Sequence, residues 1–159
     1  MVYDWDWLGA AKEFDRAIAL QPGNGDAYFW RGNLLLAQGE FEAAIASLRQ
    51  ASALDPLGGG AKMGWGLLNG RHYDEAIRQL QSLVTTNPDD HGWHVALGLA
   101  MLETGDHAGA IASIERGVVL YAENDDLWQL AYAYGKTGRK EDAERVIAQL
   151  LQRRSQMFV

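Results

Sequence analysis

The sequence predicts an all-α solenoid in which antiparallel helix pairs are stacked one after another. Three observations predict this fold. Apolar residues recur at helical spacings of three and four, glycine or proline interrupts each helical run, and the pattern returns about every 34 residues. Helical units that repeat with a period of roughly 20–50 residues are typical of solenoids, because each unit buries its apolar face against its neighbours.

The stretch from Gly25 to Gly58 is the clearest complete unit. Residues 26–38 favour a first helix, and Gly39 is expected to end it in a left-handed conformation. Residues 40–54 carry apolar side chains at spacings of three and four, which predicts a second helix that ends before Pro56. Gly32 and Ala44 are small, so we expect the two helices to approach closely there.

Copies of this unit are found by aligning the small alanine of each second helix. Spacings of 34, 32, 34 and 33 residues separate Ala10, Ala44, Ala76, Ala110 and Ala143. Twelve residues before the last four of these alanines lie Gly32, Gly64, Gly98 and Ala131, and twelve after the first four lie Pro22, Pro56, Pro88 and Ala122. We therefore expect one solenoid domain over 1–159, about four and a half repeats long: a half repeat at 1–24 and repeats at 25–56, 57–90, 91–123 and 124–159.

The remaining helices are expected at about 6–20, 60–69, 73–86, 91–104, 106–120, 125–137 and 140–153. The repeat at 57–90 is two residues short and begins near three glycines, which predicts a shorter first helix and a local change of superhelical pitch. The first half repeat lacks a partner for its stripe of Trp7, Ala10, Phe14 and Ala17. Trp5 and Trp7 either cap the core there or contact another chain or a missing upstream repeat.

Composition excludes several classes of function. The 159-residue chain is 48% apolar, has no cysteine and carries a formal net charge of −7. Disulfides and thiolate metal sites are excluded, and a nucleic-acid partner is disfavoured. The acidic N-terminus does not resemble a signal peptide, and no apolar run reaches the roughly 20 residues that cross a bilayer. We expect a cytoplasmic protein without membrane insertion.

The small residues of both helices and the closing prolines together resemble the tetratricopeptide repeat (TPR) family over essentially the whole chain. Departures are Ala131, Ala122, His107 and Lys140, where the family prefers glycine, proline and aromatic residues. The resemblance implies a right-handed superhelix whose first helices line a concave groove. It also implies a non-catalytic protein–protein interaction scaffold that binds a peptide or a helix of a partner.

The family pattern places the following candidate groove residues: Phe29, Trp30, Asn33, Lys62, Trp65, Asn69, Leu99, Trp128, Gln129, Tyr132 and Lys136. Large aromatic side chains are candidate anchors for a bound segment. The amides are expected to bond a peptide backbone, and the two lysines to supply positive charge. The alternative for each aromatic side chain is a place in the core between repeats.

No pattern for catalysis or for a cofactor is found. The glycines at 58–60 lack the Gly-Lys-Ser/Thr ending of a phosphate loop. Asp89, Asp90, His91 and His94 are better explained by a helix N-terminus than by a metal site. Only Asn33 matches the lysine and asparagine pattern with which some TPR domains hold a C-terminal carboxylate, so that ligand is disfavoured.

Two other functions stay open at this point. The half repeat and the absence of obvious polar caps suggest a fragment of a longer solenoid, or self-association into a homo-oligomer through the ends. The second alternative is that the chain is the repeat region of a larger regulator or enzyme. The fold alone does not decide between these functions.

Overall fold

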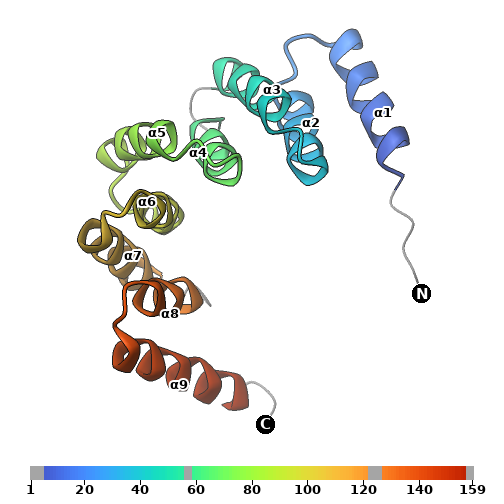
Figure 1. Cartoon of the computed structure of the whole chain (residues 1–159). Coiled ribbons are helices and arrows are strands. Elements are labelled where there is room, and N and C mark those ends of the chain that lie inside the picture. The colour runs from blue at the N-terminus through green and yellow to red at the C-terminus, as the bar shows by residue number, and fades with distance from the viewer. Residues whose placement is uncertain (1–5, 56–58, 122–126, 157–159) are drawn as a thin grey trace. The chain divides into compact units, whose positions relative to one another are not determined.

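A computed structural model describes residues 6–55, 59–121 and 127–156, with the side chains of 59–62 and 156 left out. These ranges contain helices and no strand. The helices are α1 (Trp7–Leu20), α2 (Gly25–Gln38), α3 (Phe41–Leu54), α4 (Gly59–Asn69), α5 (Tyr73–Thr86), α6 (His91–Thr104), α7 (His107–Leu120), α8 (Leu127–Lys136) and α9 (Lys140–Gln156) (Figure 1).

The predicted helix boundaries agree with these limits to within two residues, except that α9 is longer at its C-terminal end. Helix α4 has 11 residues, whereas α2 and α6 have 14, so the predicted shorter first helix is confirmed. The predicted local change of superhelical pitch stays a prediction.

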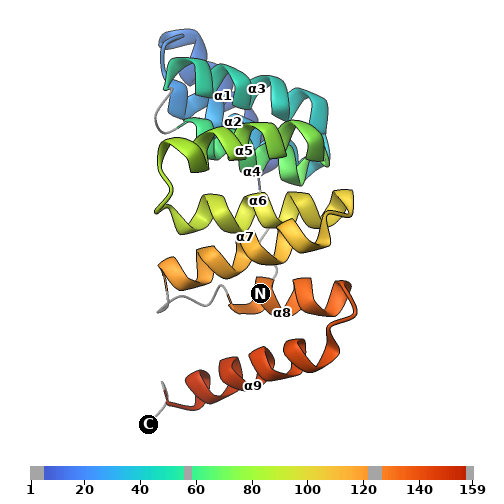
Figure 2. The ribbon, with the colours of Figure 1, turned by 90° about the vertical axis from the view of Figure 1, so that its left-hand side faces the viewer.

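The chain divides into two compact units, unit 1 (Met1–His72) and unit 2 (Tyr73–Val159). In unit 1, α1 packs on α2, α2 on α3 and α3 on α4 (Figure 1). In unit 2, α5 to α9 pack in chain order, and α6 also contacts α8 (Figure 2). The division falls inside the predicted repeat 57–90. The single domain over 1–159, with its repeat boundaries, stays a prediction.

Short polar side chains start four of the helices. Asp6, Asn24, Asp90 and Asp106 each accept a hydrogen bond from the backbone N–H three residues later, at 2.8–3.1 Å. Such N-caps satisfy one of the amide groups that a helix start leaves unpaired. Asp90 takes the helix-start role that its sequence context indicated.

Left-handed residues close the turns between the two helices of each pair. Gly39 has a φ of 79°, as the sequence predicted. Gly105 and Gly138 take the same role, whereas Arg71 does so after α4 with a φ of 63°. Glycine adopts this conformation without the steric cost that a side chain brings.

Close approach of the two helices is confirmed at the small residues. A Cβ atom at Gly32 would lie 2.7 Å from Leu48 Cγ and 3.2 Å from the Ala44 carbonyl oxygen. At Gly98 the equivalent distances are 2.5 Å to Ile114 Cγ1 and 2.7 Å to the Ala110 oxygen. A larger residue at either position would separate the helices of its pair.

In each of these two helix pairs, a serine hydroxyl of the second helix forms a hydrogen bond to the first helix. Ser47 Oγ of α3 donates to the Tyr28 carbonyl of α2 at 2.9 Å, and Ser113 Oγ of α7 donates to the His94 carbonyl of α6 at 2.8 Å. Each serine lies three residues after the anchor alanine of its helix, and both bonds span 19 residues. The repeat pattern did not predict this contact.

Candidate binding surfaces

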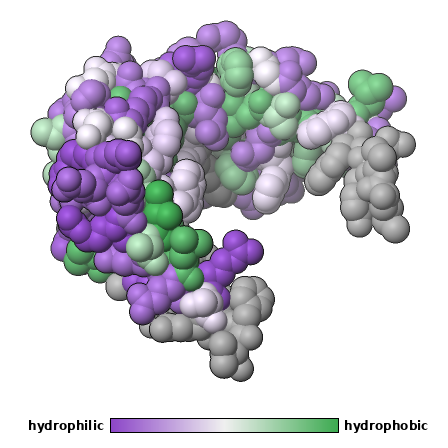
Figure 3. Space-filling view, turned by 60° about the horizontal axis from the view of Figure 1, so that its bottom comes forward, coloured by the Kyte–Doolittle hydropathy of each residue, from purple (hydrophilic) through white to green (hydrophobic). Residues whose placement is uncertain are grey.

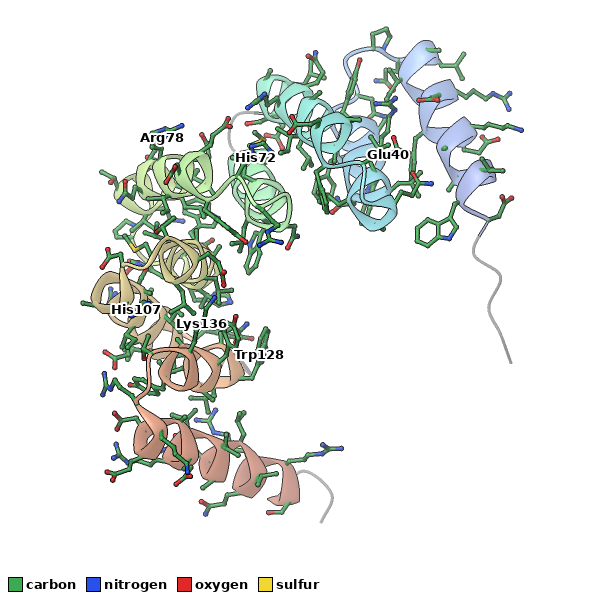
Figure 4. The ribbon with its side chains drawn as sticks, viewed as in Figure 1. Glu40, His72, Arg78, His107, Trp128 and Lys136 are labelled. Carbon is green, nitrogen blue, oxygen red and sulfur yellow. The ribbon has the colours of Figure 1, made fainter. Side chains whose placement is uncertain are left out.

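Helix α8 presents an exposed aromatic stripe in unit 2. Trp128, Tyr132 and Lys136 follow one another at intervals of four residues, so they share one face of the helix. Trp128 is 55% exposed and Tyr132 is 46% exposed. Trp128 projects from the side of α8, while His107 lies on α7 (Figure 4). We call these three residues the α8 stripe.

The charge of Lys136 is balanced inside unit 2. Its Nζ donates to Glu103 Oε1 of α6 and lies 5.7 Å from the centre of the Tyr132 ring. The hydrogen bond to Glu103 raises the pKa of Lys136 above its usual value. The stripe therefore ends in an ion pair, and the role of Lys136 in binding stays a prediction.

Gln129 is wrongly predicted as a binding residue. It is only 6% exposed, so its amide is not available to the backbone of a bound peptide. Helix α8 contacts α6 as well as α7 and α9, which buries more of its circumference than a single neighbour would. Leu99 of α6 is half-buried and packs against the hydrophobic core that α6 to α9 share.

Unit 1 contains a pocket of about 260 Å³ between α1 and α2. We call it the α1–α2 pocket. Helix α1 contributes Trp7, Ala10 and Phe14, and its N-cap residue Asp6 also lines the pocket. Helix α2 contributes Trp30, Asn33, Leu34 and Ala37. The volume of the pocket lies below the roughly 300–1,000 Å³ of small-molecule sites, so the pocket fits side chains better than a whole cofactor.

Two predicted residues of α2 line this pocket, and a third lies beside them. Trp30 is 56% exposed, and its ring meets the half-buried Phe29 ring edge-on with centres 5.1 Å apart. Asn33 Nδ2 donates to the Phe29 carbonyl at 3.0 Å, which occupies one of its donors within its own helix. Phe29 therefore supports Trp30 more than it offers a surface of its own.

The predicted residues of α4 are less informative. Trp65 is half-buried and Asn69 is exposed, while the Lys62 side chain lies outside the described residues.

Sequence reasoning did not bring Trp7 and Phe14 to the same site as Trp30. Trp7 is 41% exposed and lines the α1–α2 pocket, so it lies at the accessible end of unit 1. Hydrophobic surface (green) is visible at the right of the space-filling view, where α1 lies (Figure 3). The signal was the unpartnered stripe of the half repeat, but the repeat pattern did not say which neighbour would share it.

Two other kinds of site are absent from the part of the chain that the structure describes. Its residues include no group of three or more His, Cys, Asp or Glu placed to hold a metal ion. None of the described helices combines the length and the apolar character that crossing a membrane requires.

Antiparallel helix pairs with glycine crossings, left-handed turns and a 34-residue period define a helical repeat protein. The family described as tetratricopeptide repeat matches residues 6–58 and 62–125, so the chain belongs to the TPR family. The predicted all-α solenoid class is thereby confirmed. No curated protein matches the sequence.

Solved structures agree with this fold. The thermophilic TPR protein TTC0263 of Thermus thermophilus is 22% identical with a TM-score of 0.78, over 92% of this chain and 82% of that one. MamA from Desulfovibrio magneticus RS-1, from residue 41 to its end, is 19% identical with a TM-score of 0.76, over 94% and 87% of the two chains. At these identities the likeness supports the fold alone.

Proposed function

We propose that this chain is a non-catalytic scaffold that binds a peptide or a helix of a protein partner on the exposed sides of its first helices. The α8 stripe is the observation that carries the proposal. Two large aromatic side chains lie exposed one helical turn apart, on the face that the packing of α8 leaves accessible. Tryptophan and tyrosine are enriched among the residues that dominate binding energy.

The stripe is suited to an apolar segment with few charges. The ion pair between Lys136 and Glu103 satisfies the charged groups at its end, so a ligand need not bring a compensating charge. Neighbouring residues on α8, such as Leu127 and Leu130, are buried in the core and hold the helix in place. A rigid surface lowers the ordering cost of binding.

The proposal extends to the partner and the compartment. A net charge of −7 favours a protein partner over a nucleic acid, and a sequence without cysteine suits the reducing cytoplasm. Self-association through the ends, and a role within a larger regulator or enzyme, stay alternative predictions.

Peptide selection tests the proposal without knowledge of the natural partner. A displayed library of random peptides is panned against the wild-type chain, and Kd values of enriched peptides are measured by calorimetry. The double variant Trp128→Ala/Tyr132→Ala is expected to bind these peptides at least tenfold more weakly, because both aromatic anchors are lost.

The matched control is Val119→Ala/Leu151→Ala, which removes two other exposed apolar side chains of unit 2. It is expected to keep wild-type affinity. Circular dichroism verifies that both variants remain folded. Peptides that bind the aromatic double variant as tightly as the wild type would refute the α8 stripe as the binding surface.

A further inference from the structure

Among the residues that the structure describes, no helix fully covers the face of α1 that corresponds to the buried face of α3. In α3 the residues Ala44, Leu48 and Ala51 are buried, at 0–2% exposure. Their equivalents in α1, 34 residues earlier, are Ala10, Phe14 and Ala17, all of them half-exposed. Not one residue of α1 is buried. The difference shows how much of this face another helix covers in a complete repeat.

The internal repeats show which helix does so. In unit 1, α2 covers α3 through the contact of Gly32 with Leu48 and Ala44. In unit 2, α6 covers α7 through the contact of Gly98 with Ile114 and Ala110. The α1–α2 pocket is lined by the matching positions of α1, so it lies where a first helix would pack.

We propose that the α1–α2 pocket and the adjoining face of α1 bind an amphipathic helix of a protein partner, in the place of a first helix. The partner helix carries glycine or alanine over Ala10 and a lysine or arginine that reaches Glu13. This surface is distinct from the α8 stripe, so the inference stands or falls independently of it.

The small residue follows from the geometry of the complete pairs. At Gly32 and at Gly98 an added Cβ atom would meet the facing helix at less than 3.0 Å. Ala10 is the α1 equivalent of the facing alanines Ala44 and Ala110. A helix that packs on α1 at the same distance therefore needs a small residue at the crossing.

The basic residue follows from Glu13. It occupies the α1 position of Ser47 and Ser113, whose hydroxyls donate to the carbonyls of Tyr28 and His94. An ionised carboxylate only accepts hydrogen bonds and would repel a carbonyl oxygen placed there. Lysine or arginine one turn before the small residue would meet Glu13 with opposite charge.

The same comparison argues against a second copy of this chain as the occupant. Four residues before the small residue of each first helix lie Tyr28, Gly60, His94 and Leu127. None of these is a lysine or an arginine. The first helices of this chain therefore place no lysine or arginine against Glu13, and a basic partner helix of different sequence fits better.

The test uses a labelled synthetic peptide with the sequence of residues 24–39 and the change Tyr28→Arg. Fluorescence anisotropy reports its binding to the full chain. The wild-type chain is expected to bind it at least fivefold more tightly than the peptide that keeps Tyr28. A peptide that also carries Gly32→Leu is expected to bind at least tenfold more weakly.

Variants of the chain locate the site. Ala10→Leu blocks the crossing and is expected to weaken binding at least tenfold, whereas Ala19→Leu, exposed on the opposite face of α1, leaves it unchanged. Glu13→Ser recreates the serine of α3, so it is expected to remove the preference for the arginine peptide. Trp128→Ala/Tyr132→Ala is expected to bind as the wild type does, which separates this result from the proposed function.

The inference is overturned if no peptide binds the wild-type chain at millimolar concentration, or if Ala10→Leu and Glu13→Ser bind as the wild type does. Sedimentation of the chain alone gives a further outcome. If the chain forms a dimer and Ala10→Leu dissociates it, the occupant of the site is a second copy of the chain and not a partner helix. A monomer that binds the arginine peptide supports the inference.

Discussion

The helix pairs α6–α7 and α8–α9 of unit 2 are held together in different ways. In α6–α7 the backbones approach at Gly98 and the Ser113 hydroxyl bonds the facing helix. In α8–α9 the equivalent positions are Ala131 and Val146, so neither device is available. Instead, side chains around Tyr134 connect α8 to its neighbours.

The Tyr134 network extends across three helices. The Tyr134 hydroxyl of α8 donates to Glu115 Oε1 of α7 at 2.6 Å, and the Arg139 guanidinium lies 4.4 Å from the centre of the Tyr134 ring. Arg139 also pairs with Asp142 near the start of α9. The α6–α7 pair thus has a close backbone crossing that α8–α9 lacks, and α8 has a titratable hydrogen bond to α7. The two regions should respond differently to mutation and to pH.

The largest expected effect is at the glycine crossing. Gly98→Ala should lower the free energy of unfolding by about 2–3 kcal/mol, because the new methyl group meets a backbone oxygen that cannot move without shifting α7. The converse change Ala131→Gly should cost about 1 kcal/mol, through helix propensity. Urea unfolding measures both. An equal cost at the two positions would contradict the difference between the pairs.

A smaller effect, which depends on pH, is expected at the tyrosine. Burial and the hydrogen bond to Glu115 raise the pKa of Tyr134 to about 12, from 10.0 in an exposed side chain. The protonated phenol is therefore stabilised in the folded state. Its contribution is fully present below pH 10 and is lost as the pH rises from 10 to 12.

Tyr134→Phe should lower stability by about 1–2 kcal/mol at pH 8, because Glu115 loses a donor. The difference from the wild type should shrink between pH 10 and 12. Thermal unfolding of both proteins across this range measures it. A difference that stays constant up to pH 12 would show that ionisation of the Tyr134 hydroxyl does not change the stability of the folded protein.

The smallest expected effect is at the serine. Ser113→Ala should lower the free energy of unfolding by about 1 kcal/mol, the usual net value of one hydrogen bond. Ser155→Ala on α9 is the control, since that exposed hydroxyl bonds only within its own helix. Equal stability of the two variants would show that the serine contact between α6 and α7 is dispensable.

The sequence predicted the helices better than the exposed surfaces. Helix starts, the left-handed Gly39 and the crossing at Gly32 follow from local chemistry and from the repeat period. Gln129 was misjudged because the packing of α8 buries it, and Lys136 is paired with Glu103 of α6, two helices earlier in the chain. A repeat pattern says which positions correspond, but it does not say how many neighbours each helix has.

The pocket beside α1 had a weaker signal in the sequence. Trp7 and Phe14 stood out as a stripe without a partner helix, and Trp30 was assigned to a different surface. Only the packing of α1 on α2 places the three side chains around one pocket. Tyr134 was missed as well, because its partners are Glu115 of α7 and Arg139, which lies just before α9.

The ion pair between Lys136 and Glu103 also bears on the speed of association. Charged surfaces attract partners over long distances, and salt weakens that attraction. The α8 stripe carries aromatic rings and a lysine that is balanced by a carboxylate. The stripe itself would therefore steer a partner only weakly, and its aromatic contacts would act on how slowly the partner leaves.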